Sequence, residues 1–203
     1  STISGNRSVD DGGGVATTSG AVIVFESTVS ANTAGGGGGG IASVTGIVSG
    51  TNVTISANRS NADGGGIQSI SSPVHLINST VTLNTAADDG GGIGLTNNDN
   101  GESLRIANSI VAVNTATSNP DFTAPGNAAN NLIVLNSLIG DNQGTTLAPS
   151  TRSGGVPQPD PQGNLVGGGA GLIDPELEAL GFNGGITQTH NLQSTSLAID
   201  AGD

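Results

Sequence analysis

Aspartates that precede glycine runs are the side chains whose spacing best suits a chemical role. Asp11, Asp63 and Asp89 each stand directly before three glycines, Asp88 adjoins Asp89, and the steps between repeats are multiples of 26 residues. Carboxylates stacked in this way repel one another unless they are solvated, protonated or bridged by a cation, and Ca²⁺ is a suitable bridge. The second repeat has only glycine here, and the nonapeptide pattern of Ca²⁺-binding repeats is absent. Ca²⁺ is therefore the one candidate cofactor, with solvated loop charge as the alternative.

Catalysis on polysaccharides would require bases or paired carboxylates close together. The basic side chains are Arg7, Arg59, His75, Arg105, Arg152 and His190. Asp63 and Asp89 could approach the roughly 5–10 Å separation that glycosidases use, but they adjoin the glycines of a corner rather than a groove. Trp and Tyr, which offer faces for sugars, are absent. The sequence assigns no catalytic residue and favours a non-catalytic protein. A polysaccharide lyase or glycosidase of pectin-lyase-like fold is the alternative.

A repeat positions these residues. Segments of the type Ser-Thr-(Ile/Val)-Ser-x-Asn begin at positions 1, 27, 53, 79, 109 and 137, which are 26 to 30 residues apart. Gly-Gly-Gly followed by Val15, Ile41, Ile67 or Ile93 keeps the same phase. Short runs with a period of two residues indicate strands, and abundant Gly, Asn, Ser and Thr disfavour helices. The alternation predicts apolar columns directed inward and hydroxyl columns directed outward.

Two asparagine columns run through the repeats. The first strand of each coil ends at Asn6, Asn32, Asn58, Asn84, Asn114 and Asn142. The last strand ends at Asn52, Asn78, Asn108 and Asn136, with Glu26 in the first coil. Asn tolerates the left-handed backbone of a turn, and stacked amides can hydrogen-bond from coil to coil. We therefore expect the first column to form a structural ladder rather than a catalytic site.

Together the columns predict an all-β, right-handed parallel β-helix of about six coils of 26–30 residues, with three short strands per coil. Residues 1–164 are expected to form the coils, with a Gly/Pro-rich excursion at 143–164. Residues 165–203 are expected to form the last strands and a C-terminal cap, because a solenoid must cover its open edge and its apolar end. Nothing in the sequence caps the other end, so further coils or a partner are expected there.

Composition excludes several functional classes. The 203 residues include 35 Gly and no Cys, and 16 acidic side chains against four arginines give a net charge of −12. A basic footprint for nucleic acid is therefore missing, as is a disulfide framework. No apolar run approaches the roughly 18 residues of a transmembrane helix, so membrane insertion of this segment is not expected.

The repeats resemble the parallel β-helix repeats of bacterial surface proteins, and the Gly-Gly-x-(Ile/Val) plus Asn pattern is similar to polymorphic outer-membrane proteins. The C-terminal residues resemble the end of the choice-of-anchor Q domain family. The matching positions are Asp174-Pro175, Leu177, Leu180, Asn183-Gly184-Gly185, Thr187, Thr189, Leu192 and 196–202. That family usually has Pro where Leu197 stands. The resemblance implies an extracellular or cell-surface bacterial protein and transfers no catalytic residues.

The expected function is therefore that of a structural or adhesive extracellular solenoid. Its expected partners are glycans, other cell-surface components or copies of itself, and a filament-forming subunit is one form that it could take. Columns of Thr and Ser on a flat sheet also resemble an ice-binding surface, although the array stops where Ile110 and Leu138 replace threonine.

Overall fold

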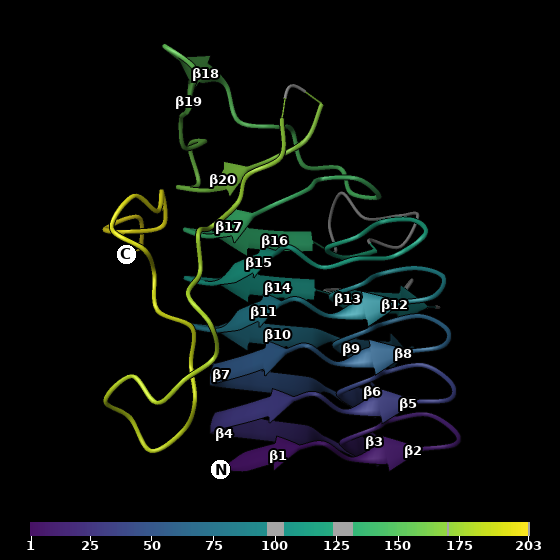
Figure 1. The fold of residues 1–203 in the computed structure, drawn as a ribbon. Coiled ribbons are helices and arrows are strands. Elements are labelled where there is room, and N and C mark those ends of the chain that lie inside the picture. The colour runs from purple at the N-terminus through teal and green to yellow at the C-terminus, as the bar shows by residue number, and fades with distance from the viewer. Residues whose placement is uncertain (97–103, 124–131, 170, 203) are drawn as a thin grey trace.

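The computed structural model describes residues 1–96, 104–123, 132–169 and 171–202, and every regular element within these ranges is a β-strand (Figure 1). The strands stack in parallel from coil to coil into a solenoid of about six turns, which confirms the predicted parallel β-helix. No described segment forms a helix of the length and hydropathy needed to cross a membrane.

The largest sheet has ten strands and takes the first and last runs of the coils. Its strands are β1 (Thr2–Ser4), β4 (Val22–Ser30), β7 (Val48–Ser56), β10 (Val74–Ile77), β11 (Thr80–Thr82), β14 (Leu104–Ala107), β15 (Ile110–Ala112), β16 (Leu132–Leu135), β17 (Leu138–Ile139) and β20 (Leu165–Val166). The corner between the two runs is turned by residues with positive φ, which are Glu26, Asn52, Asn78, Asn108 and Asn136. The second asparagine column thus sets this corner, because Asn tolerates left-handed backbone.

Two four-stranded parallel sheets form the rest of each coil. One contains β2 (Arg7–Ser8), β5 (Thr33–Ala34), β8 (Arg59–Ser60) and β12 (Thr85–Ala86). The other contains β3 (Val15–Thr17), β6 (Ile41–Ser43), β9 (Ile67–Ile70) and β13 (Ile93–Thr96). Phe122 forms a further parallel bridge with Ile93 and so continues the last sheet into the fifth coil.

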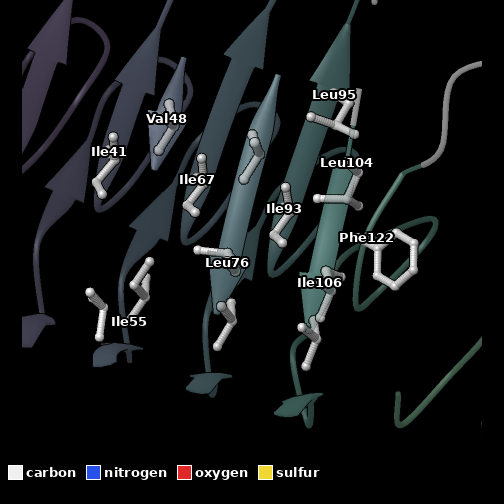
Figure 2. Close-up of a cluster of buried hydrophobic side chains, with 14 of the residues drawn as sticks. Ile41, Val48, Ile55, Ile67, Leu76, Ile93, Leu95, Leu104, Ile106 and Phe122 are labelled. Atoms are coloured by element: carbon white, nitrogen blue, oxygen red, sulfur yellow. The ribbon is translucent and has the colours of Figure 1, made fainter. Parts of the chain in front are cut away.

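The predicted apolar columns lie in register and fill the core. Ile3, Val29, Ile55, Val81, Val111 and Ile139 are stacked partners on successive strands. Ile41, Ile67 and Ile93 form a second inward column that faces them across the interior (Figure 2). Phe122 is fully buried at the end of this column, so a single aromatic ring fills the core where the glycine repeat breaks down.

The three glycines of each run have different roles, as the third coil shows. Gly64 has a φ of 63°, which favours glycine. A side chain at Gly65 would overlap with the carbonyl of Gly91 in the next coil. A side chain at Gly66 would press on the amide of Asn84. The run therefore turns the chain, lets backbones stack closely and leaves room for the asparagine of the following coil.

The excursion at 143–164 covers the C-terminal end of the stack. It contains a small antiparallel hairpin of β18 (Arg152–Ser153) and β19 (Val156–Pro157). Leu147 packs against the main core. Ser150 donates its backbone N–H to the carbonyl of Val166, and its Oγ accepts the N–H of Val166 at 2.9 Å. The free edge of β20, the last strand of the large sheet, is therefore closed at this point.

Residues 174–202, here named the C-terminal arm, do not cover that end. They form an irregular hairpin, with antiparallel bridges Leu177–Leu192 and Gly181–Thr189, that runs back along the outside of the large sheet (Figure 1). The arm reaches the second coil, where Thr28 donates its hydroxyl to the carbonyl of Gln188 at 2.6 Å. Of the segment expected to cap the solenoid, β20 completes the sheet and the arm covers its flank.

The arm changes the character of the outer face. The outward hydroxyl columns are buried rather than exposed, and their members include Thr28, Ser30, Thr54, Ser56 and Thr82. Further along, Ala112, Leu138 and Leu165 form a second apolar cluster with Ile173, and Ala198 packs against it. A hydroxyl array open to solvent, as an ice-binding face requires, is therefore wrong for this sheet.

Candidate functional site

The predicted asparagine ladder is present inside the solenoid. From the second coil to the fifth, each Oδ1 accepts two bonds from the Asn of the preceding coil, one from its backbone N–H and one from its Nδ2, at 2.9–3.1 Å. The members are Asn6, Asn32, Asn58, Asn84 and Asn114. The second Nδ2 hydrogen of Asn58 goes to the carbonyl of Val29. All polar atoms of this amide are thus used, so the ladder is a structural device.

Asn142, the sixth predicted member, lies outside the ladder. Asp121 takes its place, because its Oδ1 accepts the Nδ2 of Asn114 at 2.9 Å and the backbone N–H of Asn114 at 3.3 Å. Asp121 occupies the position of the third glycine of a run, where the earlier coils leave room for the next asparagine. Its carboxylate fills that room, and the Nδ2 of Asn142 binds the carbonyl of Leu147 instead.

A second polar ladder follows the other corner and was not predicted. The hydroxyls of Ser79, Ser109 and Ser137 each accept the backbone N–H of the preceding coil at 3.0–3.2 Å. Each hydroxyl also donates to the carbonyl two residues earlier in its own coil. Asn164 ends the column by accepting the N–H of Ser137. The signal was in the sequence, since these serines occupy the first position of the repeat.

The candidate cation ligands form a column on the outside of the glycine corner. Asp11 accepts the N–H of Gly37 at 2.8 Å, and Asp63 accepts the N–H of Asp89 at 3.1 Å. Asp89 in turn accepts the Nδ2 of Asn119 at 3.4 Å. The column therefore serves backbone and amide donors of the next coil, while Asp88 is exposed beside it.

Electrostatics in this column concentrate on Asp63. Partial burial raises the pKa of Asp63, and the carboxylates of Asp89 and Asp88 raise it further, whereas the N–H of Asp89 lowers it. Among the described residues, no three His, Asp or Glu side chains group closely enough to hold a metal ion. Asp11, Asp63 and Asp89 therefore act as hydrogen-bond acceptors that hold the glycine corner together.

Among the residues that the structure describes, a different carboxylate has the most strongly shifted pKa. Burial raises the pKa of Asp121 to about 7, even though Asn114 and the backbone N–H of Asp141 donate to it. The N–H of Asp141 reaches Oδ2 at 2.7 Å. Asp121 borders a pocket of about 260 Å³ that Asp141 and Asp174 also line. Carboxylates of unequal environment beside a pocket are a pattern of acid–base sites, but here the side chain is almost fully buried and bonded.

The basic residues lie on strands of the coils, on the hairpin of the excursion or on the arm. His75 and Arg105 are strand partners in the outward column of β10 and β14, and Arg152 donates to the carbonyls of Gly155 and Gly171. His190 lies on the arm, where Nδ1 faces the carbonyl of Glu178 at 2.7 Å and Nε2 faces the hydroxyl of Ser56 at 2.9 Å. The carbonyl can only accept, so Nδ1 carries the proton and Ser56 donates to Nε2 when the ring is neutral. This serine–histidine pair fastens the arm to the sheet.

Comparison with protein-family models, with curated proteins and with solved structures gives no match to this chain.

Proposed function

We propose that the chain is a non-catalytic structural or adhesive β-solenoid of a secreted or cell-surface bacterial protein. The observation that carries the proposal is the use of the repeated polar columns. The side chains of the asparagine ladder and of the serine ladder form hydrogen bonds with the neighbouring coils. Repetition of this kind builds a stiff, elongated scaffold, in which each coil is held chiefly by its neighbours.

The resemblance to β-helix repeats of bacterial surface proteins supports an extracellular location for this scaffold. The strong negative charge supports solubility and leaves nucleic acid as an unsuitable partner. Glycans and other cell-surface components are the partners that we propose for an acidic, extracellular scaffold.

Self-association into a filament is a narrower version of the proposal. It would use the free edges of β1, β2 and β3 in the first coil, which have no neighbouring strand in the described chain. Unpaired edges of this kind invite strand addition. The other end is covered by residues 143–164, so head-to-tail stacking would require that segment to move. Electron microscopy of the purified chain tests this version: regular fibres would support it, and a stable monomer would refute it.

One assay tests adhesion against catalysis. The purified chain is incubated with neutral and acidic polysaccharides, and bound protein and newly formed reducing ends are measured in the same samples. Binding without new reducing ends is the expected result. Release of reducing ends would overturn the proposal, because both hydrolysis and elimination create a new chain end.

A polysaccharide-active enzyme is the second candidate, and the raised pKa of Asp121 beside Asp141 and Asp174 is the observation that favours it. The pair suggested by the repeat, Asp63 and Asp89, is instead joined by a backbone hydrogen bond within the corner. Under this second candidate, Asp141→Asn would abolish the release of reducing ends, whereas Asp63→Asn would leave it unchanged. Equal activity of both variants would eliminate the pocket as an active site.

A further inference from the structure

A pocket of about 240 Å³ lies on the outer side of the sheet formed by β3, β6 and β9. Ala16 and Ala42 are strand partners in the column that borders it. Thr18 and Val44, which follow β3 and β6, line another part of it. The pocket therefore has small apolar side chains along one part and polar groups along others.

Gln68 is the unusual residue of this pocket. It follows Ala42 in the same column, and Gly94 follows Gln68 in the next coil. A long polar side chain is thus not needed for the packing of this column. Gln68 is only 8% exposed, yet its amide makes no hydrogen bond to any residue that the structure describes. Gln68 lines the pocket, so its amide can bind water or a ligand there, donating through Nε2 and accepting through Oε1.

Gly37 creates the space for this amide. A side chain at Gly37 would overlap with the amide group of Gln68, and a side chain at Gly36 would overlap with the carboxylate of Asp11. Asp11 accepts the N–H of Gly37 at 2.8 Å. The second coil has glycine instead of aspartate in the outer column, and this leaves room for side chains from the coils on either side. Asp11 from the first coil and Gln68 from the third coil therefore both lie against the glycines of the second coil and line the same pocket.

The chemistry of the lining selects the ligand. A carboxylate accepts O–H groups, and an amide both donates and accepts. The alanine methyls and Val44 offer apolar surface for C–H groups. One carboxylate is too few for a tightly held divalent cation, which takes six or more oxygen ligands when it is Ca²⁺. An anionic ligand would meet Asp11, no basic side chain in the lining and a net charge of −12.

We propose that this pocket binds one neutral sugar residue of a glycan, with Asp11 and Gln68 hydrogen-bonded to its hydroxyl groups. The site rests on the proposed adhesive function and gives it a location and a ligand class. It also explains why Gln68 interrupts a column of alanine and glycine.

The test is a titration of the ¹⁵N-labelled chain with glucose, galactose, mannose and N-acetylglucosamine at millimolar concentrations. The signal of the Gln68 side-chain amide, identified by its loss in Gln68→Leu, is followed by NMR. At least one of the sugars is expected to shift this signal. Gln68→Leu is expected to weaken binding of that sugar about tenfold, the loss that corresponds to one good hydrogen bond.

Asp11→Asn and Asp63→Asn are the matched pair of variants. Each keeps an Oδ1 acceptor for the backbone N–H that the aspartate binds, and each removes one negative charge. Only Asp11 lines the pocket, so only Asp11→Asn is expected to weaken sugar binding. Equal binding by both variants, or an amide signal that no sugar shifts, would overturn the site.

Adhesion to immobilised polysaccharide separates this proposal from the wider one. If the wild-type chain and Gln68→Leu adhere equally, the adhesive function stands and this site is overturned. If the sugar shifts the Gln68 amide but the chain fails to adhere to any surface, the site stands and the adhesive function is overturned.

Discussion

The stability of this solenoid should fall as the pH rises from about 4 to about 7, because Asp121 is buried at the end of the asparagine ladder. Burial raises the pKa of Asp121 from 3.8 to about 7 in the native state. Between these two values the native state holds a proton that the unfolded chain has released. Stability therefore declines with increasing pH across this window and is constant with respect to Asp121 outside it.

The magnitude follows from the size of the shift. Each pKa unit corresponds to about 1.4 kcal/mol, so a shift of this size is worth about 4 kcal/mol over the whole window. Between pH 5 and pH 8 the free energy of unfolding should fall by about 3 kcal/mol. The ionised carboxylate remains bonded to Asn114 and to the N–H of Asp141, so the chain is weakened rather than unfolded.

Urea denaturation at a series of pH values measures this effect, with Asp121→Asn as the decisive variant. The Asn side chain keeps an acceptor for Asn114 and cannot titrate, so its curve should lack the slope that the wild type shows. Subtracting the two curves removes the contributions of the histidines and the other carboxylates. Asp141→Asn is the control, because it removes a neighbouring charge and leaves Asp121 in place. Parallel curves for the wild type and Asp121→Asn would refute the reasoning.

Three further perturbations test the corner and the ladder. Asn58→Ala should lower the free energy of unfolding by about 4 kcal/mol, because it leaves buried donors and acceptors of both adjacent coils without partners. Asn6→Ala, at the exposed end of the ladder, should lower it by only about 1 kcal/mol. Equal losses for the two variants in urea denaturation would contradict a cooperative ladder. Gly66→Ala should cost about 1–3 kcal/mol, since the new methyl would press on a carbonyl and on the ladder amide. Gly185→Ala, whose methyl would make only ordinary contacts with the backbone of Thr187, should be neutral in the same assay. Millimolar Ca²⁺ should leave Tm unchanged, because Asp11 and Asp63 already accept backbone N–H groups. A rise in Tm that is lost in Asp63→Asn would instead establish a cation site.

The sequence predicted the coils because each column repeats the same side chain at the same step. In-register strands make such a column visible without any knowledge of the structure, as Ile3, Val29 and Ile55 show. The prediction of Asn142 was wrong because the fifth coil breaks the glycine repeat before the chain reaches Asn142. The preceding Pro120-Asp121-Phe122 stands where earlier coils have glycines and isoleucine, and only that alignment reveals the carboxylate in the place of an amide.

The path of the C-terminal arm could not be read from a repeat, because residues 174–202 have none. The sequence indicates only indirectly that the arm covers the large sheet. Ile110 and Leu138 stand in an outward column that is otherwise threonine, and outward apolar residues require a cover. Gln68 is a similar case, since an amide in a column of alanine and glycine marks a site only when its burial is known.

The arm also fixes the number of coils between its two contacts with the sheet. Arrays of repeats commonly gain or lose units freely, since each unit contacts only its neighbours. Here Gln188 meets Thr28 in the second coil while Ala198 meets the apolar cluster around Leu138. Insertion or loss of one coil would shift these partners by about 4.8 Å along the axis, which is longer than a hydrogen bond. The length of the arm is therefore matched to the number of coils between Thr28 and Leu138, and a change in that number would require a change in the arm.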